Sequence, residues 1–97
     1  MEGIKHSGEK LPYFIVLCNQ FPNAVNAVVK RSYEGHKKYE EWDADWKNWE
    51  RVENGYQTYS NALLRHLFKE GEDDELQHDI AVAWNALARL ELKLKEK

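Results

Sequence analysis

The sequence contains little cysteine, little proline and no long apolar run. Its single cysteine, Cys18, excludes an intrachain disulfide framework and a multi-cysteine zinc site, and it fits a reducing compartment. The longest clearly apolar stretch, residues 13–18, is far shorter than the roughly 20 residues that a membrane-spanning helix needs. Residues 1–10 contain no apolar segment followed by small residues, so no secretory signal is predicted. These absences predict a cytoplasmic protein with no membrane partner.

Positive charge is also scarce. The chain has 14 Lys and Arg against 17 Asp and Glu, which gives a net charge of -3, and the cations are dispersed along it. Binding to duplex nucleic acid usually requires a basic face that releases counterions, so we expect no partner of that class. A small phosphorylated ligand remains compatible with this charge, because two or three cations in one pocket are enough to hold a phosphate.

What the chain does have is a composition typical of a small folded domain. Its 97 residues are 42% hydrophobic and 12% aromatic, which disfavours disorder and allows one domain. We therefore interpret residues 1–97 as a single domain, with residues 1–10 as a flexible arm because they contain two glycines and no periodicity. A chain of this length hides only roughly 60 to 65% of its unfolded surface on folding, so its core is thin and we expect a homo-oligomer.

Helical periodicity predicts an all-α bundle of about four helices. No strand pattern competes with it, apart from the ambiguous residues 14–17, and residues 11–20 fit either an extended piece or a short helical turn. The expected helices run from an Asn23 cap to about residue 33, from 36 to about 52, from about 59 until Gly71, and from 76 to about 94.

Two of these helices carry distinct side-chain stripes. In the last helix, steps of four and three residues link Leu76, Ile80, Ala83, Leu87, Leu90 and Leu94. His78 and Asn85 lie seven residues apart on another face of that helix, where they could meet a ligand or simply satisfy neighbouring polar groups. The second helix is expected to carry the aromatic residues Tyr39, Trp42, Trp46 and Trp49. Such a stripe forms a core or a subunit interface, or it stacks on nucleobases, and both interpretations stay open. For Cys18 we expect buried packing.

Carboxylates at helical spacing raise the question of a metal site. Glu41 and Asp45 are four residues apart in the second expected helix, and Glu75 and Asp79 are four apart in the last. Together they could hold magnesium, as clustered carboxylates do in helical nucleotide pyrophosphohydrolases. A solvated helix face and capping of the helix dipole explain the same residues without a metal.

Several short motifs, taken in order, resemble a known family. They are Gly35-His36-Lys37-Lys38-Tyr39, Asn48-Trp49, Leu64-Arg65-His66-Leu67, Gly71-Glu72, His78 and Trp84-Asn85-Ala86-Leu87. This order resembles the small phage domain described as dATP/dGTP diphosphohydrolase, N-terminal, over roughly residues 8–92. The resemblance implies a virus-encoded helical protein that handles purine nucleotides and is distantly related to MazG-like all-α pyrophosphohydrolases.

The resemblance also implies a set of site residues. Carried over position by position, the ligand-binding residues are Lys38, Tyr39, Trp49, Arg65, His66, Glu72, His78 and Asn85. The chain departs from the family pattern at Ala81, where relatives carry a second histidine, and at Ala44, where active MazG enzymes carry a carboxylate.

These observations lead to two hypotheses about function. In the first, the protein is a non-catalytic phage nucleotide-binding protein in the host cytoplasm. It has no cofactor and no metal, and it sequesters a cyclic dinucleotide or related immune signal, as anti-CBASS or anti-Thoeris sponges do. In the second, it is a magnesium-dependent dATP/dGTP diphosphohydrolase that uses Glu41, Asp45, Glu75 and Asp79. Because the catalytic carboxylate signature is incomplete, the sequence favours the first.

Overall fold

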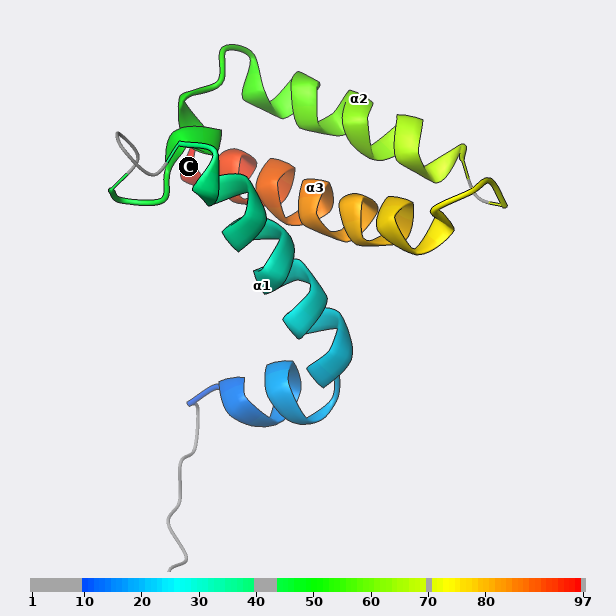
Figure 1. Ribbon diagram of the computed structural model, residues 1–97. Helices are drawn as coiled ribbons and strands as arrows, with labels where there is room; N and C mark the ends of the chain where they lie inside the picture. Colours follow the sequence, from blue (N-terminus) through cyan, green and yellow to red (C-terminus); the bar gives the residue numbers. More distant parts are fainter. Residues whose placement is uncertain (1–9, 40–43, 70, 97) are drawn as a thin grey trace, which may run out of the picture.

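The computed structural model describes residues 10–39, 44–69 and 71–96, and the account below concerns these residues. They form a π-helix η1 (Phe14–Asn19), helix α1 (Pro22–Lys37), a 3-10 helix η2 (Asn48–Arg51), helix α2 (Gly55–Leu67) and helix α3 (Glu75–Lys95) (Figure 1). This part of the chain contains no strand, so the all-α class is confirmed. None of its helices is long and apolar enough to cross a membrane. The arm expected at residues 1–10 lies outside the described residues except for Lys10.

Helix α1 begins earlier and ends later than the sequence predicts. Its first residue is Pro22. Proline lacks a backbone N–H, and this costs nothing here because an N–H in the first helical turn has no acceptor within the helix. Phe21 is the N-cap, so the predicted Asn23 cap is wrong. The helix continues through Gly35 to Lys37, because a single glycine weakens a helix without ending it.

The predicted helix over residues 36–52 is not present. Residues 44–47 form a turn and a bend, and η2 adds only four helical residues. Trp46 has a φ of 63°, the left-handed region, which no α-helix accommodates. Its ring stacks on α1, whereas the ring of Trp49 packs toward α2 and α3. The aromatic side chains thus contact different elements on two sides of the segment, whereas the side chains of one helical stripe all face the same side. Trp42 lies outside the described residues.

Helices α2 and α3 lie side by side, and α1 crosses α3, while η1 packs at the far end of α1 (Figure 1). The buried apolar residues in the described segments are Tyr59, Ala81 and Ala88, and Asn85 is the buried polar residue. The small residues of α3 therefore face α2 and α1, and most of the leucine-bearing stripe faces solvent. Leu76, Leu87, Leu90 and Leu94 are all more than half exposed. Cys18 is exposed as well, contrary to the buried packing expected from the sequence.

Candidate functional site: a cationic, aromatic cleft

A cleft of about 890 Å³ lies between α1, the segment around η2, α2 and α3. This volume is within the range of small-molecule binding sites in proteins. The second half of α1 forms one side of the cleft, and residues 46–52 form another. Because these segments are far apart in the sequence, the cleft exists only in the folded chain.

The charged side chains of the cleft are mostly cationic. Arg31 and Lys38 reach it from α1 and the residue after it, and Arg65 reaches it from α2. Glu34 is the one carboxylate that lines it among the described residues. The protein as a whole has a net charge of -3, so the cleft concentrates positive charge on an otherwise acidic molecule. Clustered cations of this kind attract anionic ligands and bind phosphates through charge-assisted hydrogen bonds.

One wall of the cleft is an aromatic cluster. Trp49, Tyr59 and Trp84 pack edge to face, with ring centroids 5.5 to 6.2 Å apart. Two hydrogen bonds fix the cluster. The Tyr59 hydroxyl donates to the Trp49 carbonyl at 2.5 Å, and Trp84 Nε1 donates to Ser32 Oγ at 2.6 Å. Burial, and to a lesser degree the nearby Tyr39, raises the pKa of Tyr59, so its phenol stays neutral and keeps donating.

A second aromatic stack stands at the end of α1. The rings of His36 and Trp46 lie nearly parallel, with centroids 3.7 Å apart, and Tyr33 continues the stack 6.1 Å from Trp46. This contact anchors the segment after α1 against the helix. It also places His36 and Trp46 among the residues that line the cleft.

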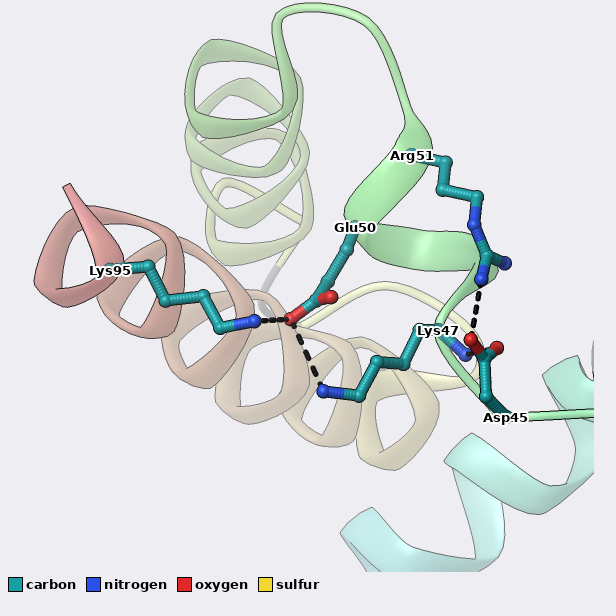
Figure 2. A network of polar contacts seen from close by, with 5 residues as sticks. All are labelled: Asp45, Lys47, Glu50, Arg51 and Lys95. Atoms are coloured by element: carbon teal, nitrogen blue, oxygen red, sulfur yellow. Dashed lines mark hydrogen bonds and ion pairs between the residues drawn. The ribbon is translucent and has the colours of Figure 1, made fainter.

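Polar contacts attach the η2 segment to the end of α3 (Figure 2). Glu50 pairs with Lys95 of α3 and with Lys47 of its own segment, and Arg51 pairs with Asp45 at 2.6 Å. The hydrogen bond from Lys95, together with the nearby cations, lowers the pKa of Glu50. Each pair is exposed and weak by itself. Together they hold the segment that carries Trp46 and Trp49 at the mouth of the cleft.

Two histidines meet where α2 and α3 approach each other. His66 Nδ1 and His78 Nδ1 are 2.8 Å apart, so one nitrogen donates and the other accepts. Desolvation lowers the pKa of His66, and the charges of His78, Arg31, Arg65 and Lys69 lower it further. The neutral form of His66 is therefore favoured. His66 lines the cleft, and His78 supports it from behind.

The structure brings most of the residues suggested by the family resemblance to one place. Six of the eight line the cleft: Lys38, Tyr39, Trp49, Arg65, His66 and Asn85. His78 contacts His66 but is not a lining residue. Glu72 is exposed in the turn between α2 and α3 and does not line the cleft. Asn85 is buried and donates Nδ2 to the Ala81 carbonyl at 2.7 Å, which orients its amide at the cleft floor.

The ligand-binding residues predicted from the sequence do not include several polar and aromatic residues that line the cleft, among them Arg31, His36, Tyr59 and Trp84. A signal for Arg31 was present, since Arg31, Gly35 and Lys38 follow helical spacing and so lie on one face. Trp84 stands directly before Asn85, but nothing in the local pattern indicates that it would face α1.

The carboxylates proposed for magnesium do not come together. Asp45 pairs with Arg51 in the segment tied to Lys95, at the C-terminal end of α3. Asp79 and Glu75 lie toward the opposite end of that helix, about 24 and about 30 Å from Lys95 along its axis at 1.5 Å per residue. Glu41 lies outside the described residues. No three His, Cys, Asp or Glu side chains within residues 10–39, 44–69 and 71–96 are grouped to hold a metal ion.

Fold and cleft together define a small all-helical protein with a cationic, aromatic cleft. A family model described as dATP/dGTP diphosphohydrolase, N-terminal, matches residues 2–97. The chain belongs to this family, which confirms the resemblance seen in the sequence and gives the protein a nucleotide-related function. Neither the curated proteins nor the solved structures contain a match to the chain.

Proposed function

We propose that the protein binds a nucleotide in the cleft and sequesters it without hydrolysing it. The observation that carries this proposal is the convergence of Arg31, Lys38 and Arg65 beside the Trp49, Tyr59 and Trp84 cluster. A nucleotide combines phosphates with flat bases, and this cleft offers partners for both. The family assignment supports the same class of ligand.

Each part of the ligand has a matching group in the cleft. The guanidinium groups of Arg31 and Arg65 can fork onto phosphate oxygens, and Lys38 adds a point charge. His66 and Asn85 can hydrogen-bond a phosphate or the edge of a base. Tyr39 and Trp49 offer ring faces or edges against which a base can pack, and base–aromatic stacking contributes about 1 to 3 kcal/mol per base.

The ligand class that we propose is a cyclic dinucleotide or a related immune signal in a phage-infected cell, as in CBASS or Thoeris defence. Such a signal carries more than one phosphate and base, which suits a cleft with three cations and several rings. Sequestration needs tight binding and no general base, so the cations, aromatic rings and hydrogen-bonding side chains of the cleft are sufficient for it. The host cytoplasm is the compartment in which such a sponge would act.

A second candidate, the magnesium-dependent dATP/dGTP diphosphohydrolase, is favoured by the family description. Of its four proposed ligands, Glu41, Asp45, Glu75 and Asp79, the three that the structure describes do not lie at one place. The chain's own residues do not fit a single magnesium site built from that set.

One incubation separates the two functions. The purified protein is mixed with 3′,3′-cyclic di-AMP, 3′,3′-cyclic GMP-AMP, dATP or dGTP, each with Mg²⁺, then denatured, and the nucleotides are separated by chromatography. Sequestration predicts that at least one nucleotide stays with the native protein when unbound nucleotide is removed before denaturation, and that this nucleotide is then recovered intact. Release of monophosphate and pyrophosphate from dATP or dGTP would establish the hydrolase and refute the sponge.

A further inference from the structure

The leucine-bearing face of α3 is exposed to solvent in the single chain, which indicates a packing partner outside it. Its residues are Leu76, Ile80, Ala83, Leu87, Leu90 and Leu94, and we call them the leucine seam. The face of α3 that packs on α2 and α1 is the opposite one, which carries Ala81, Asn85 and Ala88. The four leucines of the seam are 51 to 69% exposed. A run of exposed leucines along one helix face of a soluble protein marks an interaction site.

The spacing of the seam identifies the kind of partner it fits. Alternating steps of four and three residues are the a and d positions of a coiled coil, in which each apolar side chain packs among four residues of a second helix. The seam spans about 27 Å at 1.5 Å per residue, and its partner must be a helix of similar length. In the described residues, η1, α1 and α2 are all shorter than α3.

We propose that α3 pairs antiparallel with α3 of a second copy of this chain. When Leu76 lies opposite Leu94 of the second copy, Ile80 lies opposite its Leu90 and Ala83 opposite its Leu87. Every seam position then meets an apolar partner, and the small Ala83 meets the large Leu87 at the centre. A two-fold axis makes the second half of the interface identical to the first.

Charge selects the same register. In this pairing Asp79 lies beside Lys93 of the second copy, and the two-fold axis repeats the pair. Both side chains are exposed in the single chain, where Lys93 Nζ also lies over the Tyr56 ring, 5.6 Å from its centroid. In a parallel pair Asp79 would instead lie beside Trp84, which gives no ion pair. The antiparallel arrangement therefore satisfies both the apolar and the charged positions.

The thin core of the single chain supports this arrangement. Among the described residues no large side chain is fully buried, and two of the three buried apolar residues are alanines. A second copy on the seam would bury leucines that the fold leaves in water, and burial of apolar area drives such association.

The test is the oligomeric state of the full chain, measured by light scattering after gel filtration. We expect an assembly of at least two copies, and we expect Leu87→Glu to halve its mass or reduce it further while the helical circular dichroism is retained. The matched control is Leu64→Glu, since Leu64 is 48% exposed on α2 and outside the seam. A monomeric wild type, or an assembly that Leu87→Glu leaves intact, would overturn the proposal.

A charge exchange tests the register. Asp79→Lys alone and Lys93→Asp alone each place like charges together twice per pair, so each variant should associate more weakly than the wild type. Mixing the two variants restores both opposite-charge pairs, and we expect the wild-type association to return. If mixing restores nothing while both variants stay helical, the helices do not pair in this register and the second copy, or another helix, docks differently.

Discussion

Replacing Arg31 with alanine should weaken nucleotide binding about 10- to 30-fold. Arg31 lines the cleft from α1 and is partly buried, so its guanidinium can meet a phosphate with part of its hydration already removed. A hydrogen bond to a charged group contributes about 1.5 to 3 kcal/mol, and we use about 1.5 to 2 kcal/mol because the side chain is not fully buried. Every 1.4 kcal/mol is a factor of ten in affinity.

The neighbouring residue provides the matched control. Lys30 is also cationic and stands next to Arg31 on α1, but it is exposed and does not line the cleft. Isothermal titration of 3′,3′-cyclic GMP-AMP, or of whichever nucleotide binds in the screen, should show Arg31→Ala weakened and Lys30→Ala changed by less than about threefold, as expected for a screened surface charge. Equal losses in both variants would mean that general electrostatic attraction, not the cleft, holds the ligand.

Three further predictions concern the groups around the cleft. Because the pKa of His66 lies below its unfolded value of about 6.5, the stability that its neutral form confers is present above that pH and is lost as the pH falls toward the lowered pKa. Chemical denaturation should show that the free energy of unfolding decreases as the pH falls below about 6.5, and His66→Gln should reduce this decrease. Tyr59→Phe removes the hydrogen bond to the Trp49 carbonyl and should cost about 1 kcal/mol of unfolding free energy in the same assay, whereas an unchanged stability would mean that water replaces the bond. Glu50→Gln should loosen the η2 segment from Lys95, seen as weaker nucleotide binding in titration at unchanged helicity, and equal affinity would show that the other contacts suffice.

Helices α2 and α3 show what a sequence can predict. For α3 the apolar spacing predicted the correct type and nearly the correct extent, whereas α2, expected from about residue 59 until Gly71, runs from Gly55 to Leu67. The spacing could not show which face of α3 is buried. Leucine is the more apolar residue, yet Ala81 and Ala88 face α2 and α1. Close approach of helices favours small side chains, so the alanines and not the leucines of α3 lie at its contacts within the chain.

The segment between α1 and α2 shows why the rest could not be predicted. Tyr39, Trp46 and Trp49 have helical spacing, but Trp46 has a left-handed backbone conformation that turns the chain. As a result, the Trp46 ring stacks on His36 of α1, whereas the Trp49 ring packs on Trp84 of α3. Such a turn depends on tertiary contacts and leaves no local signal. The family motifs named Lys38, Arg65 and Asn85 without any knowledge of the turn, and all three line the cleft, while their role in binding stays a prediction.

The most direct test of nucleotide binding in the cleft is to follow the tryptophan indole N–H signals of ¹⁵N-labelled protein during titration with the nucleotide. Trp49 and Trp84 belong to the cleft wall, so their signals should move and saturate with the ligand, and should do so more weakly in the Arg31→Ala variant. Saturable binding that leaves both indole signals in place would contradict the assignment of the site to this cleft.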